Sequence, residues 1–219
     1  MDADFWHERW KNGQIGFHQD EINPYLMRYW SALELKKDDT VFVPMAGKSK
    51  DILWFMQQDH PVIAVELSEQ AIVAFFEENH LDVQIERKEN FSIYYTSMLT
   101  FYCGDYFNLS KAILSDVKAV FDRAALIALP PDMRKSYVEK SKYILPPSAQ
   151  TLLITMEYRQ SEMSGPPFSV LEEEVHAFYD KSHSVSLLET FDVLAENPQF
   201  VKKGLTAMVE KAYSLKPSS

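Results

Sequence analysis

Four apolar segments of the chain are each followed at once by residues whose types suit ligand binding. Gly47 follows the first segment, and Glu66 ends the second, 19 residues further along. Asp105 and Tyr106 follow the third segment, and Arg123 follows the fourth. A glycine turn lets a ligand approach the backbone, a carboxylate accepts hydrogen bonds from hydroxyls, and a guanidinium binds an anion. The sequence therefore places its candidate binding residues at these four positions.

Glu66 carries the strongest of these signals. Nucleotide-binding βαβ units have an acidic residue about 20 residues after the first glycine turn, where it accepts hydrogen bonds from a ribose. An alternative is that Glu66, two residues before Ser68, only favours the N-terminus of the next helix through the helix dipole. We favour ribose binding, because a carboxylate at the end of an apolar strand costs desolvation energy that ribose hydroxyls offset.

The other positions leave alternatives open. Gly47 stands alone, whereas dinucleotide and phosphate loops need two or more glycines, so the sequence disfavours pyrophosphate binding. Asp105 and Tyr106 are more typical of a turn, although an aromatic ring there could flank a flat base. Arg123 either pairs with the adjacent Asp122 or meets a negatively charged substrate.

Strands and helices that alternate along the chain must position these residues. Apolar runs at residues 41–45, 62–66, 119–122 and 151–155 predict strands, and a turn and a helical pattern follow each of the first three. This order is typical of βαβ units, so we expect an α/β fold with a mostly parallel sheet covered by helices on both faces. Ligands bind beyond the carboxyl ends of such strands, which would bring the candidate residues together.

The remaining segments are expected to complete a single domain over residues 1–219. Residues 1–36 predict two short helices, and residues 91–103 predict a β-hairpin inserted into the alternating pattern. Residues 184–191 and 205–209 alternate like two more strands with a short connection. An antiparallel pair that closes a parallel sheet is common in this fold class.

Composition narrows the possible partners. The chain has 219 residues and a net charge of −10, so its field repels phosphate backbones and anionic lipids, and we expect no nucleic-acid or membrane partner. Cys103 is the single cysteine, and no apolar run approaches the roughly 20 residues of a membrane helix. We therefore expect a cytoplasmic protein. The histidines lack metal-ligand spacing, so we expect no metal, and no exposed apolar stripe stands out, which favours a monomer.

Six short motifs, in this order and spacing, make the chain resemble the bacterial type of the thiopurine S-methyltransferase family. The resemblance extends from Phe5 to about Val209. The motifs are Phe5-Trp6 with Gly13, G-F-H-Q at 16–19, V-P-M-A-G-K-S at 43–49, V-E-L-S at 65–68, D-R-A-A-L at 122–126 and G-P-P-F-S-V at 165–170.

The family belongs to the class I S-adenosylmethionine-dependent methyltransferases. The resemblance implies a Rossmann-like, mostly parallel seven-stranded sheet with one antiparallel strand and an N-terminal helical cap over S-adenosylmethionine. That cofactor has no pyrophosphate, which accounts for the single glycine. Met45 and Ala46 stand where relatives more often have Leu-Cys, a volume-tolerant exchange. The cofactor would be held by Trp10, Met45, Gly47, Glu66, Asp105, Tyr106 and Arg123.

The activity implied by the resemblance is methyl transfer to the sulfur of an aromatic or heterocyclic thiol such as a thiopurine, with S-adenosylhomocysteine as product. Arg123 would orient the acceptor and favour its thiolate. Phe17, Pro166, Pro167 and Phe168 would contact the acceptor, although the two prolines also suit a simple break before a helix.

Three other functions stay open from the sequence. Methylation of selenium or tellurium compounds would use the same fold and chemistry. A non-catalytic nucleoside-binding module would need only Glu66 and its neighbours. A nicotinamide-dependent oxidoreductase would also use Glu66 for a ribose, but the lone Gly47 argues against that class.

Overall fold

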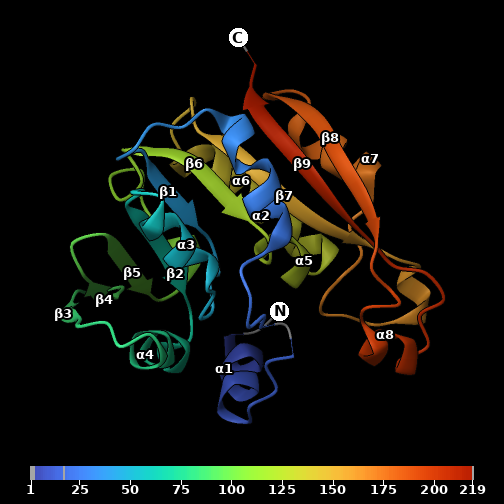
Figure 1. The fold of residues 1–219 in the computed structure, drawn as a ribbon, viewed down its shortest axis with the longest axis horizontal. Helices are drawn as coiled ribbons and strands as arrows, with labels where there is room; N and C mark the ends of the chain where they lie inside the picture. Colours follow the sequence, from blue (N-terminus) through green and yellow to red (C-terminus); the bar gives the residue numbers. More distant parts are fainter. Residues whose placement is uncertain (1–2, 17, 219) are drawn as a thin grey trace.

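One sheet of nine strands runs through residues 3–16 and 18–218, the part of the chain that the computed structural model describes (Figure 1). The strand order is β3-β4-β5-β2-β1-β6-β7-β9-β8. The parallel pairings join five central strands, which confirms the predicted α/β fold with a parallel centre, but four of the eight pairings are antiparallel, so the whole sheet is mixed. These strands are β5 (Leu99–Cys103), β2 (Val62–Glu66), β1 (Thr40–Val43), β6 (Val117–Asp122) and β7 (Gln150–Glu157).

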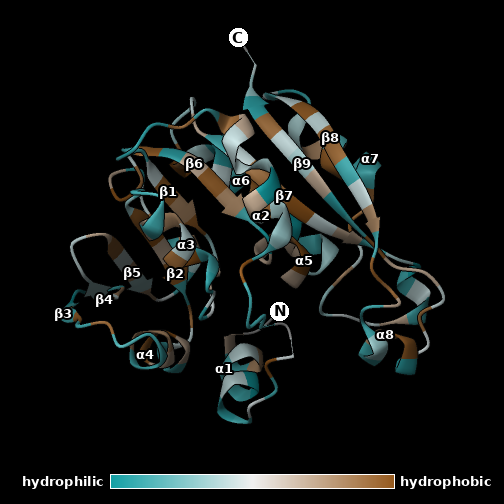
Figure 2. Cartoon of the chain, in the orientation of Figure 1, coloured by the Kyte–Doolittle hydropathy of each residue, from teal (hydrophilic) through white to brown (hydrophobic). Residues whose placement is uncertain are grey.

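Consecutive residues of the central strands pack on opposite faces of the sheet. Phe42 belongs to one buried cluster, while Val41 and Val43 belong to the other. Val120 and Phe121 are divided in the same way. Because both faces are covered, these strands appear in the sequence as continuous apolar runs, which is why the pattern predicts them (Figure 2).

Helices cover both faces of the sheet, as predicted. The first cluster contains residues of α2 (Pro24–Tyr29), η1 (Trp30–Leu33), α3 (Asp51–Gln57) and α4 (Glu69–Glu78). The second contains residues of α5 (Ala125–Ala128), α6 (Pro131–Ile144) and α7 (Glu172–Tyr179). The shorter or peripheral elements are α1 (Ala3–Lys11), η2 (Tyr106–Asn108), η3 (Gln160–Glu162) and α8 (Pro198–Lys202).

The expected count of seven strands with one antiparallel strand is wrong, because antiparallel hairpins extend the sheet at both edges. β4 (Ser92–Tyr95) runs against β5, and β9 (Val209–Pro217) runs against β7. The outermost strands are β3 (Gln84–Arg87) and β8 (His183–Asp192). Every residue of β3 is exposed, so no apolar alternation in the sequence indicates this strand.

Two predicted segments have a different place in the sheet. In the segment 91–103, β4 and β5 do pair as a hairpin, but β5 also pairs in parallel with β2 and so belongs to the central sheet rather than to an insertion. The last strand was expected at 205–209, yet β9 begins at Val209. The apolar residues before Val209 belong to no strand. Leu205 and Met208 instead pack into a small third buried cluster.

The two N-terminal helices pack in different places. Asn23 caps α2 by accepting hydrogen bonds from the N–H groups of Tyr25 and Leu26, and Pro24 occupies its first position, as the sequence predicts. α2 then packs into the first buried cluster. α1 lies at the carboxyl-end edge of the sheet, where it contacts α4 (Figure 1). In the described part of the chain, no helix is long and apolar enough to cross a membrane.

Arg134 joins three segments behind the sheet from within the core. Its side chain is 1% exposed, and its Nε donates to the Leu129 carbonyl at 2.9 Å. Its terminal nitrogens donate to the Ser169 carbonyl at 2.9 Å and to Glu174 Oε2 at 2.7 Å. α6 is thereby tied to the end of α5, to the loop after β7 and to α7.

We predict that Arg134→Ala lowers the free energy of unfolding by about 2–4 kcal/mol, because it leaves two buried carbonyls and one carboxylate without their donor. Lys135→Ala, on the exposed side of the same helix, should change that free energy by less than about 0.5 kcal/mol. Urea denaturation followed by circular dichroism measures both. Equal effects of the two substitutions would contradict the role assigned to Arg134.

Candidate active site

A cavity of about 600 Å³ opens at the carboxyl ends of the parallel strands. Its wall is formed by α1, by the turns that follow β1, β2, β5 and β6, by the ends of β7 and β9, and by residues near α8. This is the edge at which ligands bind in open α/β sheets.

Nine of the eleven residues that the sequence singles out line this cavity. They are Trp10, Met45, Gly47, Glu66, Asp105, Tyr106, Arg123, Pro166 and Pro167. Phe168 does not line it: its N–H donates to the Ile127 carbonyl at 2.7 Å, and its ring packs on Gly165. Phe17 lies outside the described residues.

Glu66 joins the turns after β1 and β2. Its Oε2 accepts the N–H of Gly47 at 2.8 Å, and its Oε1 accepts the N–H of Ser68 at 2.8 Å. Burial raises the pKa of Glu66, and the backbone N–H groups oppose that rise. The backbone N–H of Leu67 also acts on this carboxylate. The two roles that the sequence left open are compatible, because a carboxylate has about four lone-pair positions and three backbone donors do not use them all.

The turn at Gly47 lies directly against Trp10. Gly47 has φ of +55°, and a Cβ placed there would come within 3.3 Å of Trp10 Cζ2. Met45, two residues earlier, also has a positive φ of 46°. Glycine is therefore favoured at 47 by both backbone conformation and space, and the indole and the bare turn form one wall of the cavity.

Arg123 pairs with Asp51 rather than with its neighbour Asp122. Its Nε lies 3.3 Å from Asp51 Oδ2, and both side chains are largely buried. Asp51 also accepts the N–H of Asn23 at 2.7 Å and the hydroxyl of Ser49 at 2.8 Å. The Nε side of the guanidinium is thus held from behind, which leaves its terminal amino groups to serve the cavity.

Asp122 instead organises the turn that carries Arg123. Its carboxylate accepts the N–H groups of Ala125 and Leu126 at 3.2 Å and the hydroxyl of Tyr137 at 2.7 Å. Burial raises the pKa of Asp122 to about 6, against the effect of these donors. The alternative of an Asp122–Arg123 pair is therefore wrong.

Asp105 and Tyr106 form the far end of the cavity wall. Asp105 is exposed and accepts the N–H of Phe107 at 2.9 Å, which starts η2. Tyr106 is 3% exposed, and its hydroxyl bonds to Ser141 Oγ at 2.6 Å. The Tyr106 ring also stacks on Phe42, so it is a fixed part of the wall.

Sequence patterns missed several polar residues of the cavity. Arg9 and His18 come from the N-terminal segment, and Glu210 comes from the start of β9. Burial lowers the pKa of His18, and Lys48 adds to that effect. Glu210 could have been noticed in the sequence, because it is a carboxylate next to the apolar residues of the last strand. Among the described residues, no group of three or more His, Cys, Asp or Glu side chains is placed to hold a metal.

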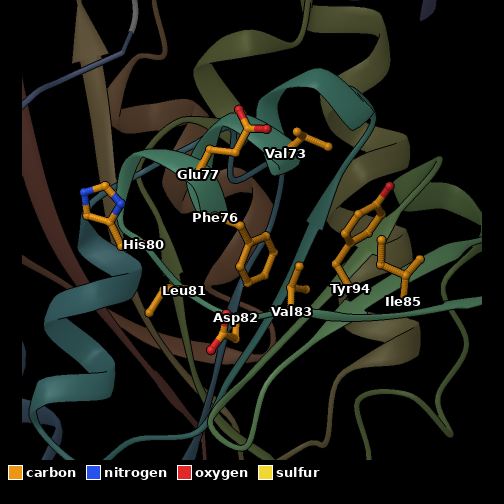
Figure 3. A pocket seen from close by; sticks show the side chains of 9 residues that line it. All are labelled: Val73, Phe76, Glu77, His80, Leu81, Asp82, Val83, Ile85 and Tyr94. Atoms are coloured by element: carbon orange, nitrogen blue, oxygen red, sulfur yellow. The ribbon is translucent and has the colours of Figure 1, made fainter.

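A second hollow of about 430 Å³ lies between α4 and the β3–β4 hairpin (Figure 3). None of the residues predicted for the site lines it. Its wall is mainly apolar, and consists of Val73, Phe76, Glu77, His80, Leu81, Asp82, Val83, Ile85 and Tyr94.

The fold is shared with solved methyltransferases. A 1,6-didemethyltoxoflavin-N1-methyltransferase from Burkholderia thailandensis, with bound S-adenosylhomocysteine, superposes with a TM-score of 0.67 at 16% identity, over 99% of this chain and 87% of that one. An S-adenosylmethionine-dependent methyltransferase from Anabaena variabilis gives a TM-score of 0.62 at 11% identity, over 99% and 95% of the two chains.

Sequence comparison gives the family. A family profile described as thiopurine S-methyltransferase matches residues 1–218. Proteins named thiopurine S-methyltransferase from Nitrosospira multiformis and Pseudomonas aeruginosa are 46% and 45% identical over 215 residues, which is 98% of this chain and 98% and 99% of theirs. The chain therefore belongs to the thiopurine S-methyltransferase family and is an S-adenosylmethionine-dependent methyltransferase.

Proposed function

We propose that this enzyme methylates the sulfur of aromatic or heterocyclic thiols, thiopurines among them. The observation that carries the proposal is a single cavity that has the Glu66 carboxylate at one end and the Arg123 guanidinium further along the same edge of the sheet. The names of the relatives support the same class of acceptor.

The order of the strands supports a direction for the cofactor. β5, β2, β1 and β6 are consecutive neighbours, so the turns after them form a row. The adenine would lie by Asp105 and Tyr106, the ribose on Glu66, and the methionine portion by Gly47 and Trp10. The bare turn at Gly47 fits a ligand without phosphates, and it offers no set of glycine N–H groups that a pyrophosphate would need. Met45 borders the same turn.

Arg123 would then stand where the methyl group is presented. When bound, S-adenosylmethionine supplies a methyl group on a sulfonium sulfur that is already activated for in-line displacement. The chain must hold the acceptor sulfur about 3–3.5 Å from that carbon. Arg123 favours the anionic sulfur, and Pro166 and Pro167 give a stiff apolar wall that excludes water. Phe17 remains part of this proposal for the acceptor side.

Cofactor binding should depend on Glu66. We expect Glu66→Gln to weaken S-adenosylmethionine binding by about 10- to 100-fold, because a charged acceptor of ribose hydroxyls is lost. Isothermal titration calorimetry measures the dissociation constant. Glu69→Gln is the control, since Glu69 lies at the start of α4 and outside the cavity wall. NAD should not bind wild type, and tight NAD binding would overturn the proposed cofactor.

Methyl transfer should follow the chemistry of the acceptor. Labelled methyl from S-adenosylmethionine should reach a thiopurine and thiophenol but not phenol, because phenol stays protonated near neutral pH and its oxygen is a harder, weaker nucleophile than a thiolate. Selenite in the same panel tests the alternative acceptor class. If the cofactor binds and only selenite is methylated, the thiol assignment is wrong.

Arg123 should shift the pH dependence of the reaction. Because its charge lowers the pKa of a bound thiol, Arg123→Ala should move the rising limb of the pH profile of kcat for thiophenol upward by about one pH unit. The loss in rate is then greatest at low pH and shrinks above the pKa of the thiol. Arg123→Lys keeps the charge and should retain most of the wild-type limb. A uniform loss for Arg123→Ala at every pH would contradict thiolate stabilisation.

A further inference from the structure

Glu210 is a carboxylate in the cavity that the assigned roles do not use. It pairs with Met156 of β7 at the start of β9, and both residues line the cavity. β7 and β9 follow β6 in the sheet order, on the side away from β1, β2 and β5. Glu210 therefore lies beyond Arg123, at the opposite end of the row from the proposed ribose site.

The surroundings of Glu210 leave it able to accept a further hydrogen bond. The side chain of Tyr25 in α2 is close enough to influence Glu210, and a single donor uses only one of the roughly four lone-pair positions of a carboxylate. Burial raises the pKa of Glu210, and the charge of Glu196 adds to the rise. Tyr25 and the charge of Arg123 oppose it.

Two opposite charges thus face one pocket. A second anion beside Glu210 is disfavoured, whereas a neutral ligand with a negative end toward Arg123 and an N–H toward Glu210 satisfies both. A heterocyclic thiol in its thione form has this dipole, because its sulfur is electron-rich and the adjacent ring nitrogen carries a hydrogen.

We infer that Glu210 accepts the hydrogen bond, and then the proton, of a ring N–H next to the acceptor sulfur. The inference rests on the proposed thiol methyltransferase activity and narrows its acceptor to heterocyclic thiones. It makes Glu210 a catalytic residue for those acceptors and leaves simple aryl thiols to Arg123 alone.

The step balances without a further reactant. The ring N–H bond breaks, its proton passes to a carboxylate oxygen of Glu210, and its electron pair forms the C=N bond. The π pair of the C=S bond moves to sulfur, and a sulfur electron pair forms the new S–CH3 bond. The pair of the broken sulfonium S–CH3 bond stays on the sulfur of the methyl donor. The proton leaves Glu210 to water after the product departs.

The test compares two acceptors in one variant. For Glu210→Gln, we expect kcat/KM for a thiopurine with an N–H beside its sulfur to fall at least tenfold, since a general base typically contributes 10²–10⁴-fold. For thiophenol, which has no ring nitrogen, we expect a change of less than threefold. For wild type, kcat/KM for the thiopurine should fall at low pH as Glu210 is protonated. For Glu210→Gln, this fall at low pH should be absent.

A matched control and a binding measurement separate the outcomes. Glu173→Gln in α7 removes the same charge from an exposed position outside the cavity wall and should spare both acceptors. The dissociation constant of S-adenosylmethionine should stay unchanged in Glu210→Gln. Equal losses for both acceptors, or no loss for the thiopurine, overturn the inference and leave the proposed function standing. Failure of wild type to methylate either acceptor overturns both.

Discussion

The buried carboxylate of Glu66 is the constraint on which the cavity depends. A charge at 7% exposure is costly, and it is tolerated because Gly47 and Ser68 each donate a backbone N–H to it. The same two bonds fix the turns after β1 and β2 relative to each other. One side chain therefore sets the spacing of two turns, and the indole of Trp10 approaches the first of them closely because Gly47 has no Cβ.

Asp51 is a second buried carboxylate that fixes several segments of the cavity wall. It holds Arg123 from behind, and it also accepts hydrogen bonds from Asn23 and Ser49. The N-terminal segment, the first turn and the end of β6 consequently meet at one buried carboxylate. Because Asn23 also caps α2, the orientation of Arg123 and the start of that helix are fixed by the same contact.

The sequence predicts those parts of the molecule whose determinants are local. Strands β1, β2, β6 and β7 are buried on both faces and so appear as apolar runs, and Glu66 stands out as a carboxylate that ends one of them. β3 has no such pattern because all its residues are exposed. The sequence did not predict the partner of Arg123. That partner, Asp51, opens α3 and lies 72 residues earlier, whereas the sequence offered the adjacent Asp122.

Several polar and apolar residues of the cavity could not be predicted from local patterns, because they come from distant segments. Arg9 comes from α1, Pro166 from a loop after β7 and Glu210 from β9. The register of β9 against β7 places Glu210 at the cavity, because Glu210 pairs with Met156 near the end of β7. The net charge of −10 is a sum over the whole chain, whereas the cavity combines cations with carboxylates. The presence of both signs of charge in one cavity follows from how the fold brings distant segments together, and composition alone does not predict it.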